Sequence, residues 1–287
     1  MGDMRFNYLE PASIEEAVSL LGKYDGKVRV IAGGTDLMVQ MKDRALKPEH
    51  VVDIEYIPGL DFINYGDTEG LRIGALTTIR TLEKSAVLQE RYPVISQAAG
   101  LLGSVAIRNV ATIGGNLCNA APSADTAPAL IGLSAKAKII GKDGERVVPF
   151  EEFFIGPGET VLKRGELLAE VQVPVPLPDT RGVYLKHSRS SIDLATVGVV
   201  VIMTLGSGGL CQEVKVVLGA VAPTPIRAKR AEVLLKGTNI TPSLIKEAAQ
   251  AASEEAQPIT DVRASAEYRR EMVKLLTRRV IEQLVAG

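Results

Sequence analysis

Three closely spaced prolines, Pro174, Pro176 and Pro178, constrain the fold more than any other feature of this 287-residue chain. They follow directly after an apolar run, Leu167 to Val173, which is typical of a strand. Proline cannot donate a hydrogen bond to a sheet and it stiffens a connecting segment. We therefore expect a domain boundary here, with a first domain over residues 1–176 and a second over residues 177–287.

Short strands and helices are mixed on both sides of this boundary. Two hairpins are indicated before it, because paired apolar runs flank turns rich in glycine and charged residues. Three further strands and then three helices are expected after it. The expected strands are 28–31, 50–54, 62–65, 71–75, 135–140, 146–150, 167–173, 183–187, 195–205 and 211–220, and the clearest helices begin near residues 14, 37, 93, 229, 242 and 266. Hairpins imply antiparallel pairing, so this mixture predicts the α+β class.

Composition excludes several classes of protein. Lysine and arginine total 33 against 34 acidic residues, so the chain lacks the basic excess of a nucleic-acid binder. Two cysteines, Cys118 and Cys211, cannot ligate an iron–sulfur cluster, and two scattered histidines make a poor zinc site. Redox chemistry would therefore need an organic cofactor or a partner chain. The N-terminus has no signal-peptide pattern and the longest apolar run, Ala195 to Leu205, is too short for a membrane span, so we expect a cytoplasmic protein.

The first segment that suggests chemistry runs from Ile31 to Leu37, with the sequence Ile-Ala-Gly-Gly-Thr-Asp-Leu. It follows an expected strand and opens an expected helix. Paired glycines let backbone amide groups approach an anion closely, so the pattern suits a phosphate group. An ordinary strand–helix turn, in which Asp36 only caps the helix, is the alternative.

The second such segment begins at Thr112, continues as Ile-Gly-Gly-Asn-Leu-Cys-Asn, and reaches Asp125. Its small and amide residues would pack a core poorly, so we expect a functional loop followed by a helix. Two glycine pairs that each offer backbone donors suit a ligand with two phosphates. Neither segment matches the Rossmann or P-loop patterns. Two unrelated turns remain the alternative.

A third segment, Tyr184-Leu185-Lys186-His187-Ser188-Arg189, lies on an expected strand. Alternation along the strand places Tyr184 and Lys186 on the same face. A lysine here could stabilise negative charge on a reduced flavin ring. An exposed strand lysine is the alternative.

At these three segments the sequence resembles the FAD-binding medium subunit of the molybdenum hydroxylases, the family of xanthine dehydrogenase, carbon monoxide dehydrogenase and nicotinate dehydrogenase. The likeness begins at Phe6, Tyr8 and Pro11 and extends to the C-terminal helices. It implies an FAD-binding region of the PCMH (vanillyl-alcohol-oxidase-like) type with two subdomains that divide near residues 55–60. A smaller α+β domain with a three-stranded antiparallel sheet would follow and close over the flavin.

The resemblance also implies which residues contact FAD. The two glycine segments would hold the pyrophosphate and ribose, Asp125 would accept hydrogen bonds from cofactor hydroxyls, and Leu168 and Lys186 would lie near the ring system, with Leu194 beside it. The full implied set is Ile31, Ala32, Gly33, Gly34, Thr35, Asp36, Leu37, Thr112, Ile113, Gly114, Gly115, Asn116, Asn119, Asp125, Leu168 and Lys186. The resemblance implies no catalytic side chain and no metal ligand in this chain.

Members of this family receive electrons from a [2Fe–2S] small subunit, which draws them from a molybdopterin large subunit. The flavin then reduces NAD⁺, a quinone or oxygen, and the complex is commonly a dimer of heterotrimers. We expect this chain to be such an electron-transfer subunit. Two alternatives stay open: a stand-alone flavin reductase or oxidase of the same fold, and a non-catalytic flavin-binding assembly module.

Overall fold

The computed structural model describes residues 5–286, beginning with a small N-terminal lobe. Its sheet is parallel and has the order β1-β3-β2. The elements of the lobe are β1 (Asn7–Leu9), α1 (Ile14–Lys23), β2 (Val28–Ile31), α2 (Leu37–Lys42) and β3 (His50–Asp53). Ser13 caps α1, because its side chain accepts a hydrogen bond from the Glu16 amide at 3.2 Å. The strand expected at 28–31 is confirmed residue for residue.

The second layer is a five-stranded antiparallel sheet with the order β4-β5-β10-β6-β7. Its strands are β4 (Ile63–Gly66), β5 (Gly70–Gly74), β6 (Lys136–Gly141), β7 (Gly144–Pro149) and β10 (Leu167–Val173). Both hairpins expected from the sequence are therefore confirmed. The apolar run that precedes the prolines forms the central strand, β10, which is buried along nearly its whole length.

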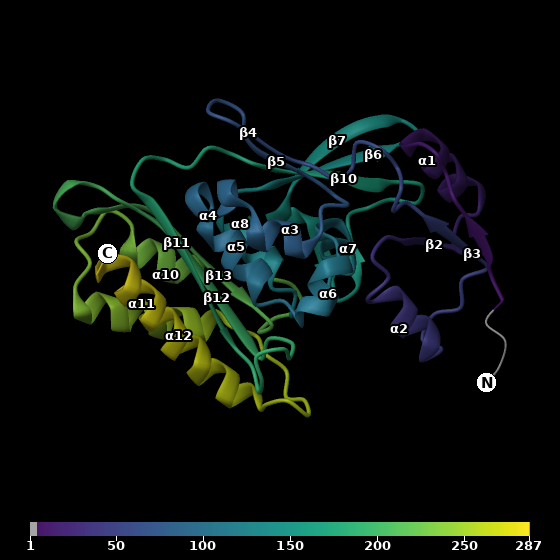
Figure 1. Cartoon of the computed structure of the whole chain (residues 1–287). Coiled ribbons are helices and arrows are strands. Elements are labelled where there is room, and N and C mark those ends of the chain that lie inside the picture. Colours follow the sequence, from purple (N-terminus) through teal and green to yellow (C-terminus); the bar gives the residue numbers. More distant parts are fainter. Residues whose placement is uncertain (1–4, 287) are drawn as a thin grey trace.

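Short helices and one small hairpin lie beside this sheet (Figure 1). The apolar faces of most of them, though not of α6 or β9, share one core with the inner residues of β5, β6 and β10. These elements are α3 (Ile79–Lys84), α4 (Ala86–Arg91), α5 (Pro93–Gly100), α6 (Val105–Val110), α7 (Ile113–Cys118), α8 (Thr126–Gly132), α9 (Phe150–Phe153), β8 (Phe154–Gly156) and β9 (Glu159–Thr160).

The C-terminal part has a four-stranded antiparallel sheet with the order β11-β12-β13-β14. Its elements are β11 (Thr180–His187), β12 (Val197–Leu205), a 3₁₀ turn η1 (Ser207–Gly209), β13 (Cys211–Gly219), β14 (Ile226–Arg227), α10 (Lys229–Leu235), α11 (Pro242–Glu255) and α12 (Ala266–Ala286). The α+β class is confirmed, but the expectation of three strands is wrong. The fourth strand, β14, has only two residues, so it carries no periodic pattern that a sequence could reveal.

Both faces of the C-terminal sheet are covered, which explains the continuous valine-rich run of β12. Val200 and Ile202 point into the core shared with the N-terminal helices. Val199, Val201 and Met203 point instead toward α10, α11 and α12, which form the outer layer (Figure 1). The sheet is thus held between two helical layers. No helix within residues 5–286 is both long and apolar enough to cross a lipid bilayer.

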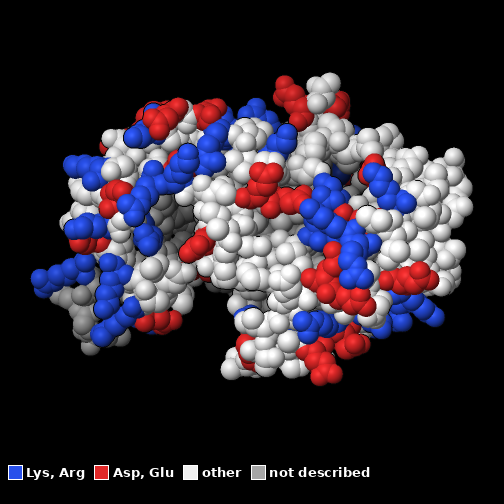
Figure 2. Space-filling model, turned by 180° about the vertical axis from the view of Figure 1, so that it is seen from behind, with Lys and Arg blue, Asp and Glu red and all other residues white. Residues whose placement is uncertain are grey.

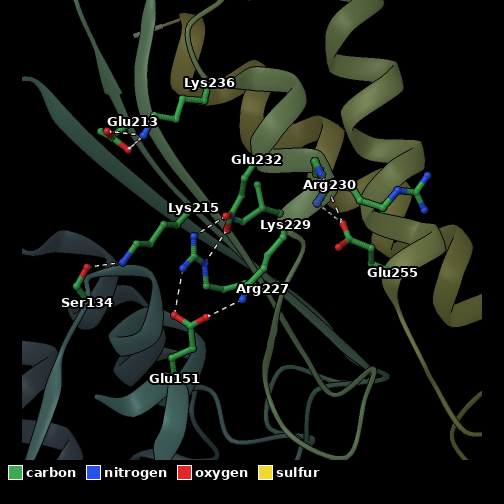
Figure 3. Close-up of polar contacts among 12 residues, drawn as sticks. Ser134, Glu151, Glu213, Lys215, Arg227, Lys229, Arg230, Glu232, Lys236 and Glu255 are labelled. Atoms are coloured by element: carbon green, nitrogen blue, oxygen red, sulfur yellow. Dashed lines mark hydrogen bonds and ion pairs between the residues drawn. The ribbon is translucent and has the colours of Figure 1, made fainter. Parts of the chain in front are cut away.

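Polar contacts add to this packing where β13 and β14 approach α9 and the end of α8 (Figure 3). Arg227 donates to both oxygens of Glu232, at 3.0 and 2.5 Å, and to Glu151 on α9 at 3.1 Å. Lys215 contacts the hydroxyl of Ser134. The bonds to Glu151 and Ser134 fix the C-terminal sheet against the first 176 residues, and Glu232 holds Arg227 in place for this contact.

Candidate functional site

A cleft of about 630 Å³ opens between the N-terminal lobe and the rest of the molecule. The rear view in Figure 2 shows the surface hollowed beside this lobe, with acidic and basic residues interspersed around it. The β2–α2 connection forms one wall, and α6, α7 and the residues up to Asp125 form the other. Such a volume is in the range of binding sites for cofactors and other small ligands.

The first glycine segment, Ile31–Leu37, lines this cleft. Gly34 has a φ of 69°, a left-handed conformation that glycine adopts without strain. The amides of residues 33–37 have no hydrogen-bond partner within the described part of the chain. Unpaired amides that face a cleft are costly unless a ligand or water accepts their bonds. A run of free amide donors of this kind is suited to an anion.

The second glycine segment, Thr112–Asn119, differs from its expected form. Residues 113–118 are a helix, α7, and not a loop, so that expectation is wrong. Gly114 donates to the Ala75 carbonyl at 2.8 Å and Gly115 donates to the Thr112 hydroxyl at 3.1 Å. The amides of Ile113 and Asn116 are also bonded within the protein. The backbone donors of residues 113–116 are therefore already in use.

Side chains of the second segment take the place of its amides in the cleft. The Asn116 side-chain oxygen accepts a bond from Thr126 at 2.6 Å, and the Asn119 oxygen accepts one from Gln40 at 3.2 Å. Each bond fixes an amide group whose nitrogen donates to no acceptor among residues 5–286. The two asparagines can therefore donate to a ligand in the cleft. The Gln40–Asn119 bond also joins the two walls.

At the end of the second wall, Asp125 meets the C-terminal sheet. Its carboxylate accepts from the Tyr184 hydroxyl at 2.6 Å and from Lys186 at 3.0 Å, and Lys186 also donates to the Leu101 carbonyl at 2.8 Å. Burial raises the pKa of Asp125, and the Lys186 charge and the Tyr184 hydrogen bond act in the opposite direction. Burial also raises the pKa of Tyr184 well above its ordinary value. The strand alternation that placed Tyr184 and Lys186 on one face is confirmed.

Most of the residues expected at a flavin site come together in this one cleft. The cleft is lined by Ile31, Ala32, Gly33, Gly34, Thr35, Asp36, Leu37, Thr112, Gly114, Gly115, Asn116, Asn119, Asp125 and Leu168. Ile113 and Lys186 are not part of its lining. Ile113 is fully buried in the core beneath α7. Lys186 lies behind Asp125, and only 3% of its side chain is exposed.

The structure adds cleft residues that sequence reasoning missed. Glu166 lines the cleft, and both of its oxygens accept bonds from Arg146, at 2.9 and 2.7 Å. This ion pair holds the pKa of Glu166 below its ordinary value, mainly through the Arg146 hydrogen bond. The local sequence does not reveal this ion pair, because Arg146 and Glu166 are 20 residues apart and two strands, β8 and β9, lie between them in the chain. Cys118 also lines the cleft, and burial raises the pKa of its thiol to about 12, which suits a packing role better than a redox role.

Two protein-family models together match nearly the whole chain. The FAD binding domain in molybdopterin dehydrogenase matches residues 4–176, and the CO dehydrogenase flavoprotein C-terminal domain matches residues 183–284. The carbon monoxide dehydrogenase medium chain of Hydrogenophaga pseudoflava is 35% identical over 278 residues, which cover 96% of each chain. The xanthine dehydrogenase FAD-binding subunit of Escherichia coli O157:H7 is 31% identical over 283 residues, or 98% of this chain and 96% of that subunit.

Solved structures give the same result. A chain of carbon monoxide dehydrogenase from Hydrogenophaga pseudoflava superimposes with a TM-score of 0.95 and 36% identity, covering 100% of this chain and 99% of that one. Quinoline 2-oxidoreductase from Pseudomonas putida 86 gives a TM-score of 0.94 at 29% identity, with the same coverage. The likeness thus extends over both parts of the fold and includes every segment that forms the cleft.

Proposed function

Because the chain belongs to the FAD-binding medium subunits of the molybdenum hydroxylase family, we propose that it accepts electrons from a [2Fe–2S] partner subunit and passes them to NAD⁺ or another acceptor. It carries that family's FAD-binding domain and is a subunit of an oxidoreductase. Bound FAD would supply the redox chemistry, so the subunit needs no catalytic side chain of its own for that step.

The observation that carries the proposal is the set of unpaired amides at residues 33–37, which face a cleft of about 630 Å³. In the proposed complex these amides bind the pyrophosphate of FAD. Thr112, Asn116 and Asn119 bind phosphate or ribose oxygens from the opposite wall. The residues present therefore fit an extended ligand with an anionic centre.

The remaining cleft residues would orient the rest of the cofactor. Asp125 is proposed to accept hydrogen bonds from hydroxyl groups of FAD, since a carboxylate is an acceptor only. Leu168 packs near the ring system, and Leu194, which is 59% exposed, lies beside it. Lys186 is proposed to act on the flavin through Asp125, because its ammonium group is already bonded to that carboxylate.

We also propose that the chain works with an iron–sulfur small subunit and a molybdopterin large subunit, as a dimer of heterotrimers. Several relatives are named as medium chains or medium subunits, which supports such an assembly. The domains are proposed to divide at residues 176 and 177, with the subdomain break near 55–60. Both cysteines are unpaired, which suits work in the reducing cytoplasm.

Visible absorption of the purified chain, with NADH then added anaerobically, tests the proposal. Flavin bands near one per chain that bleach with NADH are the expected result. Bands that persist would overturn NAD⁺ as the acceptor and leave a quinone or oxygen. A colourless chain that also fails to take up added FAD would overturn the flavin role altogether and favour an assembly module. Turnover of a substrate by the chain without partners would favour a stand-alone enzyme.

A further inference from the structure

Tyr184 makes a buried contact that flavin binding by the cleft does not itself require. Only 3% of this residue is exposed, and it is not part of the cleft lining. Its hydroxyl donates to Asp125 at 2.6 Å, while the other carboxylate oxygen of Asp125 accepts from Lys186 at 3.0 Å. One carboxylate at the cleft wall is thus held by two side chains of β11, both from the C-terminal sheet.

The neighbouring strand is adapted to this contact. Gly198 interrupts an otherwise bulky run, Val197 to Leu205, and lies opposite Lys186 in the β11–β12 ladder. A Cβ atom on Gly198 would lie 2.9 Å from the Tyr184 hydroxyl and 3.1 Å from its ring. Glycine in a strand interior weakens the strand, so its presence here has a local reason. It leaves room for the Tyr184 ring and lets the hydroxyl reach Asp125.

We propose that Tyr184 is a positioning residue that holds the Asp125 carboxylate ionised and oriented toward the cleft, so that FAD binding depends on the C-terminal sheet. This inference rests on the proposed function, in which Asp125 accepts hydrogen bonds from FAD. Tyr184 itself does not touch the cofactor. It acts by fixing the rotamer of Asp125 and by stabilising its charge.

The surroundings of Asp125 give the proposal a pH-dependent consequence. The titratable groups that face Asp125 within residues 5–286 are Tyr184 and Lys186, whereas the helices beside it present Gln97 and Asn116, which do not titrate. Burial raises the pKa of Asp125, and the Tyr184 hydrogen bond opposes that rise. Removing the hydroxyl therefore raises this pKa further. FAD binding needs the ionised carboxylate. As the pH is lowered, the variant would therefore lose FAD affinity at a higher pH than the wild type does.

The test is FAD binding to the full-length, FAD-free chain, followed by flavin fluorescence across pH for wild type and Tyr184→Phe. The phenylalanine keeps the ring and removes only the hydroxyl. We expect about tenfold weaker binding at neutral pH, typical of losing one hydrogen bond to a charged group. We also expect the acidic limit of binding to move to higher pH. An unchanged affinity and pH profile in a folded variant would overturn the proposal.

Tyr92→Phe is the matched control. Tyr92 is 1% exposed and its hydroxyl donates to the Pro174 carbonyl at 3.2 Å, away from the cleft. Losing that bond should lower the melting temperature while FAD affinity and its pH profile stay unchanged. A shift in the pH profile of this control as large as that of Tyr184→Phe would show a merely structural effect and overturn the proposal.

A double-mutant cycle with Asp125→Asn separates this inference from the proposed function. We expect Asp125→Asn to weaken FAD binding, and Tyr184→Phe to add no further loss in that background. Additive losses would overturn the inference alone. Wild-type affinity in Asp125→Asn would overturn the inference and the role proposed for Asp125, while FAD binding by the chain, and with it the proposed function, would stand. If Tyr184→Phe does not fold, Gly198→Ala takes its place, because its methyl group would displace the Tyr184 hydroxyl. It should move the acidic limit in the same direction, and an unmoved limit would overturn the inference.

Discussion

The two glycine segments have similar sequences but differ in the hydrogen bonding of their backbone amides. Ile31–Leu37 and Thr112–Asn119 each contain isoleucine, a glycine pair and a polar residue, and both line the same cleft. The amides of residues 33–37 have no partner among the described residues, whereas the amides of residues 113–116 are bonded within the protein. A glycine pair therefore does not define a phosphate site by itself. The bonding of its amides decides what it can do.

The residues that precede each pair explain the difference. The first pair follows β2 at the edge of the lobe, and Gly34 turns the chain with a φ of 69°, which leaves the amides of residues 33–37 without partners along the cleft lining. The second pair follows Thr112, which caps α7 with its hydroxyl and starts a helix. There, glycine serves close packing, because a Cβ atom on Gly114 would lie 2.7 Å from the Ala75 carbonyl oxygen.

Gly114→Ala should give the largest effect, on stability. The added methyl group would meet rigid backbone and the Cβ of Ala75 at 2.8 Å, so α7 must shift away from β5. Overpacking of this kind costs about 3 kcal/mol at the upper end of its usual range. The free energy of unfolding of the FAD-free chain, measured with denaturant, should fall by that amount.

Valine at both Gly114 and Gly115 should abolish FAD retention altogether.

Gly115→Ala is the control for Gly114→Ala. Gly115 is exposed, and the only atom within 4 Å of its added Cβ would be the Thr112 hydroxyl oxygen, at 3.0 Å. Alanine also favours a helix over glycine by about 1 kcal/mol, which offsets this contact. Stability should therefore change little. Equal losses in the two variants would mean that close packing does not distinguish the second segment.

Gly34→Ala should mainly weaken the binding of FAD. Alanine at a φ of 69° costs about 1 kcal/mol, and relief of that strain would turn the neighbouring amides away from the cleft. FAD affinity should fall about tenfold, for which 1.4 kcal/mol is sufficient. Titration of the FAD-free chain with FAD gives this value.

Gly26→Ala separates strain from binding. Gly26 has a φ of 77°, lies outside the cleft, and has no atom within 4 Å of an added Cβ. Gly26→Ala should lower the free energy of unfolding about as much as Gly34→Ala does, because both place alanine at a positive φ, and it should leave FAD affinity unchanged. If Gly26→Ala weakened FAD binding as much as Gly34→Ala, the first segment would have no special role in binding.

Periodic patterns allowed most of the fold to be predicted. Val28–Ile31 and Leu167–Val173 appear as expected, since each is an apolar run bounded by turn residues. The glycine-rich composition of 112–119 suggested a loop, but the Thr112 cap and the burial of Ile113 and Leu117 stabilise a helix there. Tertiary packing here outweighs the low helix propensity of the two glycines.

The site was predictable where family motifs mark it, and less so where distant side chains meet. Nothing near Lys186 in the sequence shows that its ammonium group is taken up by Asp125, 61 residues earlier in the chain. The Arg146–Glu166 pair at the cleft wall is hidden for the same reason. Such pairs depend on strand order, which periodicity alone does not specify.

Thr112→Ala should give the smallest effect and tests the comparison most directly. In the wild type the Gly115 amide donates to the Thr112 hydroxyl at 3.1 Å. The substitution removes this cap of α7 and leaves the Gly115 amide without a partner. The second segment thereby becomes more like the first. Loss of such a cap costs about 1 kcal/mol of unfolding free energy. FAD affinity should change by less than in Gly34→Ala, because the lost hydroxyl contact is offset by a newly available amide. Thr112→Ser, which keeps the hydroxyl, should retain both properties. A loss of FAD affinity in Thr112→Ala as large as in Gly34→Ala would mean that the second segment binds the cofactor as strongly as the first, even though its amides are bonded within the protein.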